Sequence, residues 1–329
     1  MNIKKILLIA SVSFVSLSAC QLVSLSANAE SYKLNMSTVL APNNPLTKGL
    51  FHFKKEVESA TDGDIKVNVF ASGSLGGTGD LIEQARAGSN VSMMADPSRL
   101  QNYVNDFGVL ASPYVFNSLE QAQKYYKSDA FKELEAELQQ KGGLVILSAN
   151  WFQGTRMLIT KKPVSTPADV KGMRIRAAGS TIGVKTVEIL GGTATPMPWN
   201  EAYTALQQQV IDGVEVHPAA FYDSKLYEVA NYIQPTNHAF LMTYLVVGEQ
   251  WLKSLPEGYQ ALLKEKASNS GDFVTKTILE NEQKYIDESI KHGMKLNKVD
   301  IKKFQENSKG LFDSIGLSSE YKKVEASLK

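Results

Sequence analysis

The sequence predicts an α/β protein built from two lobes, and three observations support this fold class. Two segments, 31–70 and 171–217, alternate between patterns typical of strands and patterns typical of helices. The chain has 329 residues, more than a single hydrophobic core usually holds. Two extended stretches, 150–156 and 238–247, have the character of connections that cross between lobes. We therefore expect two α/β units joined by a hinge.

The first unit opens with a strand and then alternates between helices and strands. The expected elements are a strand at 31–36, a helix at 45–59, a strand at 65–70, a helix that Asp80 caps and that runs to Arg86, and a central strand at 91–94. Surface helices at 119–126 and 130–141 precede a strand at 144–149. After the crossing at 150–156, a strand at 157–160 begins the second unit.

The segment 171–217 organises the second unit. It predicts a strand at 173–178, a helix capped by Ser180 or Thr181, a strand at 193–195, a helix capped by Asn200 with Ala202, Leu206 and Val210 as its apolar stripe, and a strand at 214–216. This order implies a parallel sheet with right-handed crossovers. Ligands of such units bind outside the carboxyl ends of the strands, so we expect the site there.

The C-terminal third is predominantly helical. It predicts a helix around 222–227, a strand at 238–247 that returns to the first unit, one long helix at 256–290, a short strand at 293–299, and terminal helices at 300–328. The many lysines of these terminal helices are expected to form a solvated face.

The N-terminus has the pattern of an export signal. Lys4 and Lys5 precede the apolar stretch 6–17, and residues 27–29 have the small-x-small pattern of a cleavage site. Cys20, the only cysteine, lies in a sequence that resembles a lipoprotein processing box. Either Cys20 is removed with the signal at 1–29, or the mature protein begins at a lipidated Cys20. No later stretch has the roughly 18 uncharged residues of a membrane helix.

Composition and motifs argue against several functional classes. The net charge is +1 with scattered basic residues, so we expect no nucleic-acid partner. The four histidines lack metal-ligand spacing, and the glycine-rich loop at 73–77 lacks a phosphate-binding motif. We therefore expect no cofactor, no metal and no catalytic residue, which favours a binding protein over an enzyme. A sugar-acid lyase or hydrolase is the enzymatic alternative.

Four ordered matches carry a family resemblance. They are Arg-Ile-Arg at 174–176, the run TPMPWNEAYTALQQ at 195–208, IDGVE at 211–215 and LYEVANYI at 226–233. With these segments the chain resembles the substrate-binding proteins of TRAP transporters, and the similarity extends more weakly over 32–293.

The resemblance implies a type II periplasmic-binding-protein-like fold, with two α/β lobes, a hinged cleft and a long helix spanning both lobes. The implied division is a signal peptide at 1–29, lobe I at 30–152 with a return segment at about 239–270, lobe II at 153–238, and the spanning and terminal helices at 256–329. It also implies a periplasmic location, a small-molecule carboxylate ligand, a small and a large membrane subunit as partners, and a monomer.

Arg176 is the main candidate for the ligand site. It lies near the carboxyl end of a strand, and its guanidinium can pair with both oxygens of a carboxylate, which lysine cannot. A structural ion pair with Glu188 or Glu201 is the alternative. The resemblance places the carboxylate-binding arginine at this position.

The resemblance adds further candidates, each with a structural alternative. Glu215 is expected to hold ligand hydroxyls or to orient the arginines, and Trp199 to form a flat wall. Lone histidines and aromatic residues are more often structural, and Asp96 and Arg99 can also cap a helix. This set consists of Arg156, Glu215, Trp199, Asp96, Arg99, His238, Trp151, His217 and Ser37. Family members often have asparagine after the glutamate, where this chain has Val216 and then His217.

The resulting expectation is a receptor for a monocarboxylate, with a sugar acid such as an aldonate, uronate or diketogulonate favoured. An aromatic or branched 2-oxo acid is an alternative that would use Trp151, Phe152, Trp199 and Tyr222. A C4-dicarboxylate, or a receptor role for a sensor kinase, are the others. Ligand is expected to stabilise a closed state that engages the membrane subunits.

Overall fold

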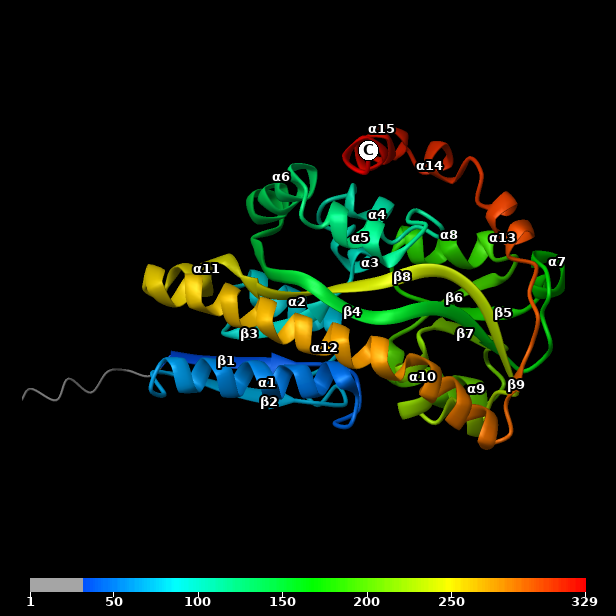
Figure 1. The fold of residues 1–329 in the computed structure, drawn as a ribbon, viewed down its shortest axis with the longest axis horizontal. Helices are drawn as coiled ribbons and strands as arrows, with labels where there is room; N and C mark the ends of the chain where they lie inside the picture. Colours follow the sequence, from blue (N-terminus) through cyan, green and yellow to red (C-terminus); the bar gives the residue numbers. More distant parts are fainter. Residues whose placement is uncertain (1–31) are drawn as a thin grey trace, which may run out of the picture. The chain divides into compact units, whose positions relative to one another are not determined.

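The computed structural model describes residues 32–329 (Figure 1). The predicted export signal and Cys20 lie outside the described residues. Within 32–329 the elements form one mixed sheet flanked by helices, as the alternating patterns predict. None of the helices within residues 32–329 is both long enough and apolar enough to cross a membrane.

The sheet runs in the order β2-β1-β3-β8-β4-β7-β5-β6, with β9 paired to β8. Its strands are β1 Tyr32–Ser37, β2 Ile65–Phe70, β3 Val91–Ala95, β4 Leu144–Thr160, β5 Arg174–Ala177, β6 Thr193–Pro196, β7 Gly213–Val216, β8 Tyr232–Gly248 and β9 Lys295–Leu296. Strands β2, β1 and β3 are parallel and make the first half of the sheet; β7, β5 and β6 are parallel and make the second half. The predicted parallel units are therefore confirmed.

The helices are short, with two exceptions. They are α1 Pro45–Ala60, α2 Thr78–Arg86, α3 Pro97–Leu100, α4 Phe107–Leu110, α5 Leu119–Tyr125, α6 Asp129–Glu137, α7 Pro167–Val170, α8 Thr181–Ile189, α9 Ala202–Gln207, α10 Pro218–Asp223, α11 Glu249–Lys253, α12 Glu257–Lys291, α13 Ile301–Asn307, α14 Leu311–Ser314 and α15 Ser318–Ser327. The predicted long helix is α12, which has 35 residues.

Two long antiparallel strands, β4 and β8, join the halves of the sheet. The prediction of a strand, a separate crossing and a second strand across 144–160 is wrong, because β4 is continuous over 17 residues. Its pairing with β8 shifts register four times, and Gly154 in its middle has a φ of +119°. These irregularities bend the strand and change which of its side chains face the cavity.

Helix α12 runs past α1 at one end and α10 at the other (Figure 1). Its side chains bind backbone groups of β4 where the ladder is irregular. Thr275 accepts a hydrogen bond from Phe152 N at 3.1 Å and donates to Asn150 O at 2.7 Å. Glu282 accepts from Thr155 N at 2.6 Å. The helix therefore supplies hydrogen bonds that β4 loses at its register shifts.

Several predicted helix boundaries are wrong. Asn200 does not cap a helix, because Trp199–Glu201 is a 3-10 turn that leads directly into α9. The helix ends at Gln207, and a left-handed backbone at Gln209 leaves Val210 46% exposed instead of in the stripe. Asp80 is not the cap residue of α2 either. It is the third residue of the helix, and its carboxylate accepts from the N of the cap residue Gly77 at 3.1 Å.

Two C-terminal predictions also change. The helix expected around 222–227 begins earlier, at Pro218, because proline suits the first helical turn, and a 3-10 turn at Leu226–Glu228 follows it. The strand expected at 293–299 is reduced to Lys295–Leu296, where it pairs with Tyr232 and Ile233.

Candidate functional site

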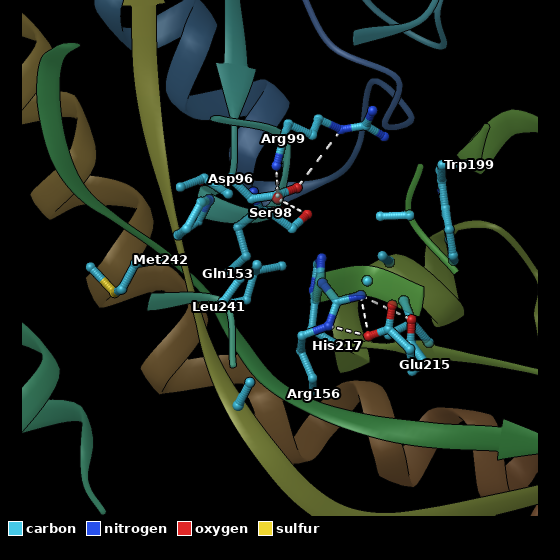
Figure 2. A pocket seen from close by; sticks show the side chains of 18 of the residues that line it. Asp96, Ser98, Arg99, Gln153, Arg156, Trp199, Glu215, His217, Leu241 and Met242 are labelled. Atoms are coloured by element: carbon cyan, nitrogen blue, oxygen red, sulfur yellow. Dashed lines mark hydrogen bonds and ion pairs between the residues drawn. The ribbon is translucent and has the colours of Figure 1, made fainter. Parts of the chain in front are cut away.

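A cavity lies between the two halves of the sheet and contains about 1100 Å³ of space not filled by atoms, part of it open to solvent. Its wall includes residues from α1, α3 and β3 on the first-half side, and from β5, α8, β7 and α10 on the second-half side. Strands β4 and β8 complete it (Figure 2).

Arg176 reaches this cavity from β5, near the end of the strand that leads to α8. The residue is only 4% exposed, and its Nε donates to Met197 O at 3.0 Å. Its guanidinium lies 5.6 Å from the centre of the Trp199 ring. Burial lowers the pKa of Arg176 to about 10, with Glu215 opposing the shift and two neighbouring guanidinium groups adding to it.

No carboxylate within residues 32–329 forms an ion pair with Arg176, so the alternative pairing with Glu188 or Glu201 is not observed. Glu188 instead pairs with Lys185. A buried guanidinium without a carboxylate partner keeps several donors available for an anion.

Arg156, on β4, is paired with Glu215, on β7. The two side chains form a hydrogen-bonded ion pair, and Arg156 Nη2 also donates to the backbone O of Glu215 at 3.1 Å. Burial alone would raise the pKa of Glu215, but Arg156 and His238 lower it to about 2. Glu215 is therefore ionised at neutral pH and neutralises Arg156.

Two buried histidines flank this ion pair. His238 Nε2 lies 3.6 Å from the Glu215 carboxylate, and its Nδ1 is 2.9 Å from the Thr236 hydroxyl. His217, at the start of α10, lines the cavity beside Arg156 (Figure 2). Burial and the charge of Arg156 lower the pKa of His217 to about 3, and burial lowers that of His238. Both rings are neutral at pH 7.

Asp96 and Arg99 reach the cavity from α3, which follows β3. Asp96 caps this helix by accepting from Arg99 N at 3.2 Å and from the Ser98 hydroxyl. The Arg99 Nε lies 3.8 Å from the Asp96 carboxylate, a loose ion pair. Asp96 thus both caps α3 and lines the cavity.

Of the predicted site residues, Arg176, Arg156, Glu215, Trp199, Asp96, Arg99, His238 and His217 line the cavity. Trp151 and Ser37 do not. Trp151 is fully buried between β4 and α1, where its ring packs over Gly49 and its Nε1 donates to Ser148. Ser37 is buried behind its neighbour Thr38, which lines the cavity instead, because neighbouring side chains of a strand face opposite sides.

Several cavity residues were not predicted from the sequence. They include Thr38, Thr78, Met94, Ser98, Gln153, Thr186, Phe240, Met242 and Thr243. Gln153 could have been proposed as a site residue from the sequence, because it lies in the predicted crossing segment three residues before Arg156. The β8 residues were not, because their facing depends on the register shifts against β4.

The charges around the cavity do not cancel. The three guanidinium groups of Arg99, Arg156 and Arg176 face the two carboxylates of Asp96 and Glu215, which leaves one positive charge. The surplus belongs to Arg176, since the other two arginines have carboxylate partners. Within 32–329 no group of three or more histidine, cysteine, aspartate or glutamate residues has metal-ligand geometry. The arrangement suits one organic anion.

Comparison with known proteins identifies a family that matches this chain. A family model described as bacterial extracellular solute-binding protein, family 7, matches residues 36–318. A solved TRAP periplasmic solute-binding protein from Escherichia fergusonii, in an apo open state, is 39% identical and covers 90% of this chain and 99% of its own, with a TM-score of 0.79.

Two ligand-bound structures of the same class are similar as well. The protein from Ochrobacterium anthropi, with bound L-fuconate, is 31% identical over 91% of this chain and 100% of its own, with a TM-score of 0.88. The protein from Actinobacillus succinogenes, with bound L-galactonate, is 29% identical over 90% and 99%, with a TM-score of 0.86. Both scores exceed that of the apo open protein despite lower sequence identity.

Proposed function

This chain belongs to family 7 of the bacterial extracellular solute-binding proteins, the solute-binding proteins of TRAP transporters, and we propose that its own ligand is a sugar acid. Members of this family bind a solute and are not enzymes, and they have the two-lobe periplasmic-binding fold. The proposal concerns the ligand, the residues that hold it and the membrane partners.

The observation that carries the proposal is the unpaired guanidinium of Arg176. It is buried, its one hydrogen bond within residues 32–329 is to Met197 O, and it accounts for the surplus positive charge of the cavity. A ligand carboxylate that takes both of its free nitrogens would cancel this charge with two parallel hydrogen bonds. Trp199 then packs beside the carboxylate end of the ligand.

The rest of the cavity favours a hydroxylated chain. Asp96 and Glu215 carry acceptor oxygens, and hydroxyl groups are the donors that an uncharged ligand chain offers them. Arg99 and the His217 ring add groups that hydrogen-bond to hydroxyl oxygens. The L-fuconate and L-galactonate of two similar proteins are hydroxylated monocarboxylates of this kind.

The alternatives have less support. An aromatic or branched 2-oxo acid is expected to contact four aromatic residues, Trp151, Phe152, Trp199 and Tyr222. Of these four, only Trp199 lines the cavity. Trp151 and Phe152 are in the core, and Tyr222 packs against Tyr227 and Tyr285 with ring centres 5.8 and 5.7 Å away. A C4-dicarboxylate would bring two negative charges to a cavity with one surplus positive charge.

In the proposed mechanism the sugar acid pairs with Arg176 while Asp96, Arg99, Glu215 and His217 hold its hydroxyls. Closure of the lobes then buries the ligand, and ligand binding stabilises the closed state. This state delivers the ligand to a small and a large membrane subunit in the periplasm, with the receptor acting as a monomer.

A binding screen tests the proposal. The protein from Glu30 onward is unfolded, washed free of copurified ligand and refolded, and its melting temperature is measured with aldonates, uronates, 2,3-diketo-L-gulonate, 2-oxo acids, C4-dicarboxylates and glycerol phosphates. A ligand that binds only the folded state raises the melting temperature according to its affinity. We expect shifts with sugar acids. A shift confined to 2-oxo acids, dicarboxylates or phosphates would overturn the proposal.

A further inference from the structure

We propose that the Oε1 of Gln153 accepts a hydrogen bond from one hydroxyl group of the ligand, and that Thr243 holds the amide of Gln153 in the orientation that this requires. This inference rests on the proposed function, because it concerns which hydroxylated acid the same cavity selects. Its basis is a chain of three hydrogen-bonding groups with only one consistent direction.

The chain begins at a backbone carbonyl. The backbone O of Trp151 can only accept a hydrogen bond. The Thr243 hydroxyl therefore donates its single proton to this oxygen, at 3.0 Å. Thr243 Oγ1 is then an acceptor toward its other neighbour, Gln153, which donates from Nε2 at 2.9 Å. The direction of both bonds follows from the carbonyl at the end of the chain.

The direction of these hydrogen bonds also determines which atom of the Gln153 amide faces the cavity. With its NH₂ group committed to Thr243, its Oε1 faces away, and Oε1 has no hydrogen-bond partner in the part of the chain that the structure describes. Gln153 is 6% exposed and Thr243 is 3% exposed. If the amide were flipped, Gln153 Oε1 would face Thr243 Oγ1, and two acceptors would meet without a proton between them. Water has little access there to replace the lost hydrogen bond.

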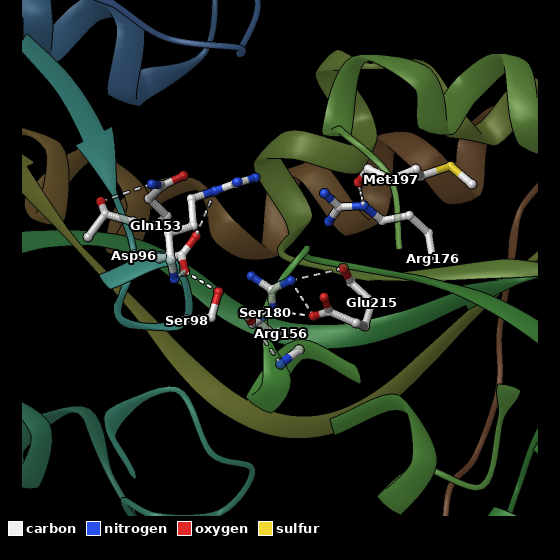
Figure 3. A network of polar contacts seen from close by, with 11 residues as sticks. Asp96, Ser98, Gln153, Arg156, Arg176, Ser180, Met197 and Glu215 are labelled. Atoms are coloured by element: carbon white, nitrogen blue, oxygen red, sulfur yellow. Dashed lines mark hydrogen bonds and ion pairs between the residues drawn. The ribbon is translucent and has the colours of Figure 1, made fainter. Parts of the chain in front are cut away.

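Gln153 lies on the side of the cavity opposite the carboxylate-binding arginine. Figure 3 shows Gln153 and Asp96 on one side of the Arg156 guanidinium and Arg176 on the other. Figure 2 agrees, with Trp199, the neighbour of Arg176, far from Gln153. The hydroxyl read by Gln153 is therefore on the part of the ligand remote from its carboxylate.

An acceptor at this position discriminates by chemistry. A hydroxyl carries a proton to donate, whereas a keto oxygen, a methyl ether or a second carboxylate does not. A buried acceptor left without a donor disfavours such ligands. Gln153 thus selects a hydroxyl over a keto or carboxylate group at the far end of the acid.

The test compares ratios of affinity. Calorimetry measures the Kd of L-galactonate and of its monodeoxy analogues, of which L-fuconate is the 6-deoxy form, for the wild type and for Gln153→Met, Thr243→Val and Thr243→Ser. We expect one analogue to bind the wild type roughly 10-fold more weakly than L-galactonate. This ratio should fall toward 1 in Gln153→Met and Thr243→Val, and persist in Thr243→Ser, which keeps the hydroxyl.

A second measurement needs no ligand. The side-chain amide protons of Gln153 should exchange slowly in the wild type and in Thr243→Ser, and faster in Thr243→Val. If L-galactonate binds but the ratio is the same in all four proteins, or if the Gln153 amide exchanges equally fast in the wild type, Thr243→Ser and Thr243→Val, this inference is wrong and the proposed function stands. If only acids without hydroxyls bind, both are wrong.

Discussion

The side-chain amide of Asn44 connects two helices that contact the cavity from opposite halves of the sheet. Its Oδ1 accepts from Leu46 N at 3.0 Å and so caps α1, while its Nδ2 donates to Asp223 Oδ2, on α10, at 2.8 Å. Gln101, after α3, makes a similar connection, because its Oε1 accepts from Ile182 N in the first turn of α8 at 2.9 Å. Neither residue lines the cavity.

The Asn44 bridge predicts an effect on affinity without contact to the ligand. Asn44→Ser keeps a capping oxygen but is too short to reach Asp223, so the arrangement of the two halves in this structure loses one hydrogen bond to a charged group. We expect ligand affinity to fall about 5-fold, equivalent to about 1 kcal/mol. Calorimetry with the best ligand of the screen measures it.

Asn68→Ser is the matched control. Asn68 donates to Asn35 Oδ1 at 3.0 Å, and both residues belong to the first half of the sheet. Its loss should leave affinity unchanged. Equal affinities for the wild type and Asn44→Ser would mean that the bridge does not contribute to ligand binding.

Arg176→Met is predicted to stabilise the empty protein and to abolish ligand binding. The substitution removes a buried charge that lacks a carboxylate partner, and apolar replacement of buried ionic groups often stabilises by about 1 kcal/mol or more. Loss of the fork should weaken ligand binding at least about 30-fold, or about 2 kcal/mol. Urea unfolding and calorimetry measure the two effects.

Arg174→Met supplies the comparison for Arg176. Arg174 lies two residues earlier on β5, and its exposed guanidinium pairs with Asp212 at 3.0 Å, outside the cavity. We expect it to bind ligand like the wild type. Tight binding by Arg176→Met would remove Arg176 from the site.

Glu215→Gln is predicted to change the preferred ligand charge. The substitution keeps the shape of the side chain and raises the surplus charge of the cavity from one to two, because Arg156 loses its partner. The ratio of affinities for a dicarboxylate and a monocarboxylate should then rise roughly 10-fold. Asp212→Asn, which alters the Arg174 pair outside the cavity, should leave the ratio unchanged.

The Glu215 variant should also be less stable, since breaking a buried ion pair on one side costs about 3 kcal/mol. The binding measurements are therefore made well below its melting temperature. An unchanged charge preference in a folded variant would contradict the assignment of the surplus charge.

His217 is predicted to lower the stability of the empty protein as the pH falls from 7 to 5, against an opposing contribution from Glu135, whose pKa burial raises to about 7. Burial lowers the pKa of His217 to about 3 from an ordinary value of 6.5, so the unfolded chain binds a proton in this window that the folded protein does not. The contribution of His217 to stability is fully present above pH 6.5 and is lost progressively below it. At pH 5 the loss from this residue is about 2 kcal/mol, and His238 adds to it in the same direction.

Urea unfolding between pH 5 and pH 8 measures this dependence. The change in stability between pH 8 and pH 5 should differ from that of the wild type by about 2 kcal/mol in His217→Asn and should be unchanged in His292→Asn, at an exposed position after α12. A steep slope that persists in His217→Asn would assign the pH dependence to other groups.

The elements of the fold could be predicted from the sequence because their signals are local. Period-two and period-3.6 patterns located the parallel units and the long helix α12, and the order of strands and helices placed Arg176 at the carboxyl end of β5. The tight turns were less predictable. Asn200 has the type of a cap residue, but the 3-10 turn after Pro198 delays the helix beyond it.

The sequence by itself determined that Arg176 lies at the carboxyl end of a strand, because local pattern sets that position, whereas Arg156 was a candidate only through the family resemblance. Only the tertiary structure decided their roles, because Glu215 reaches Arg156 and leaves Arg176 unpaired. The register shifts between β4 and β8 likewise send Trp151 into the core and Gln153 into the cavity, two residues apart. Such facing depends on how distant strands pair, and no local pattern of residues records it.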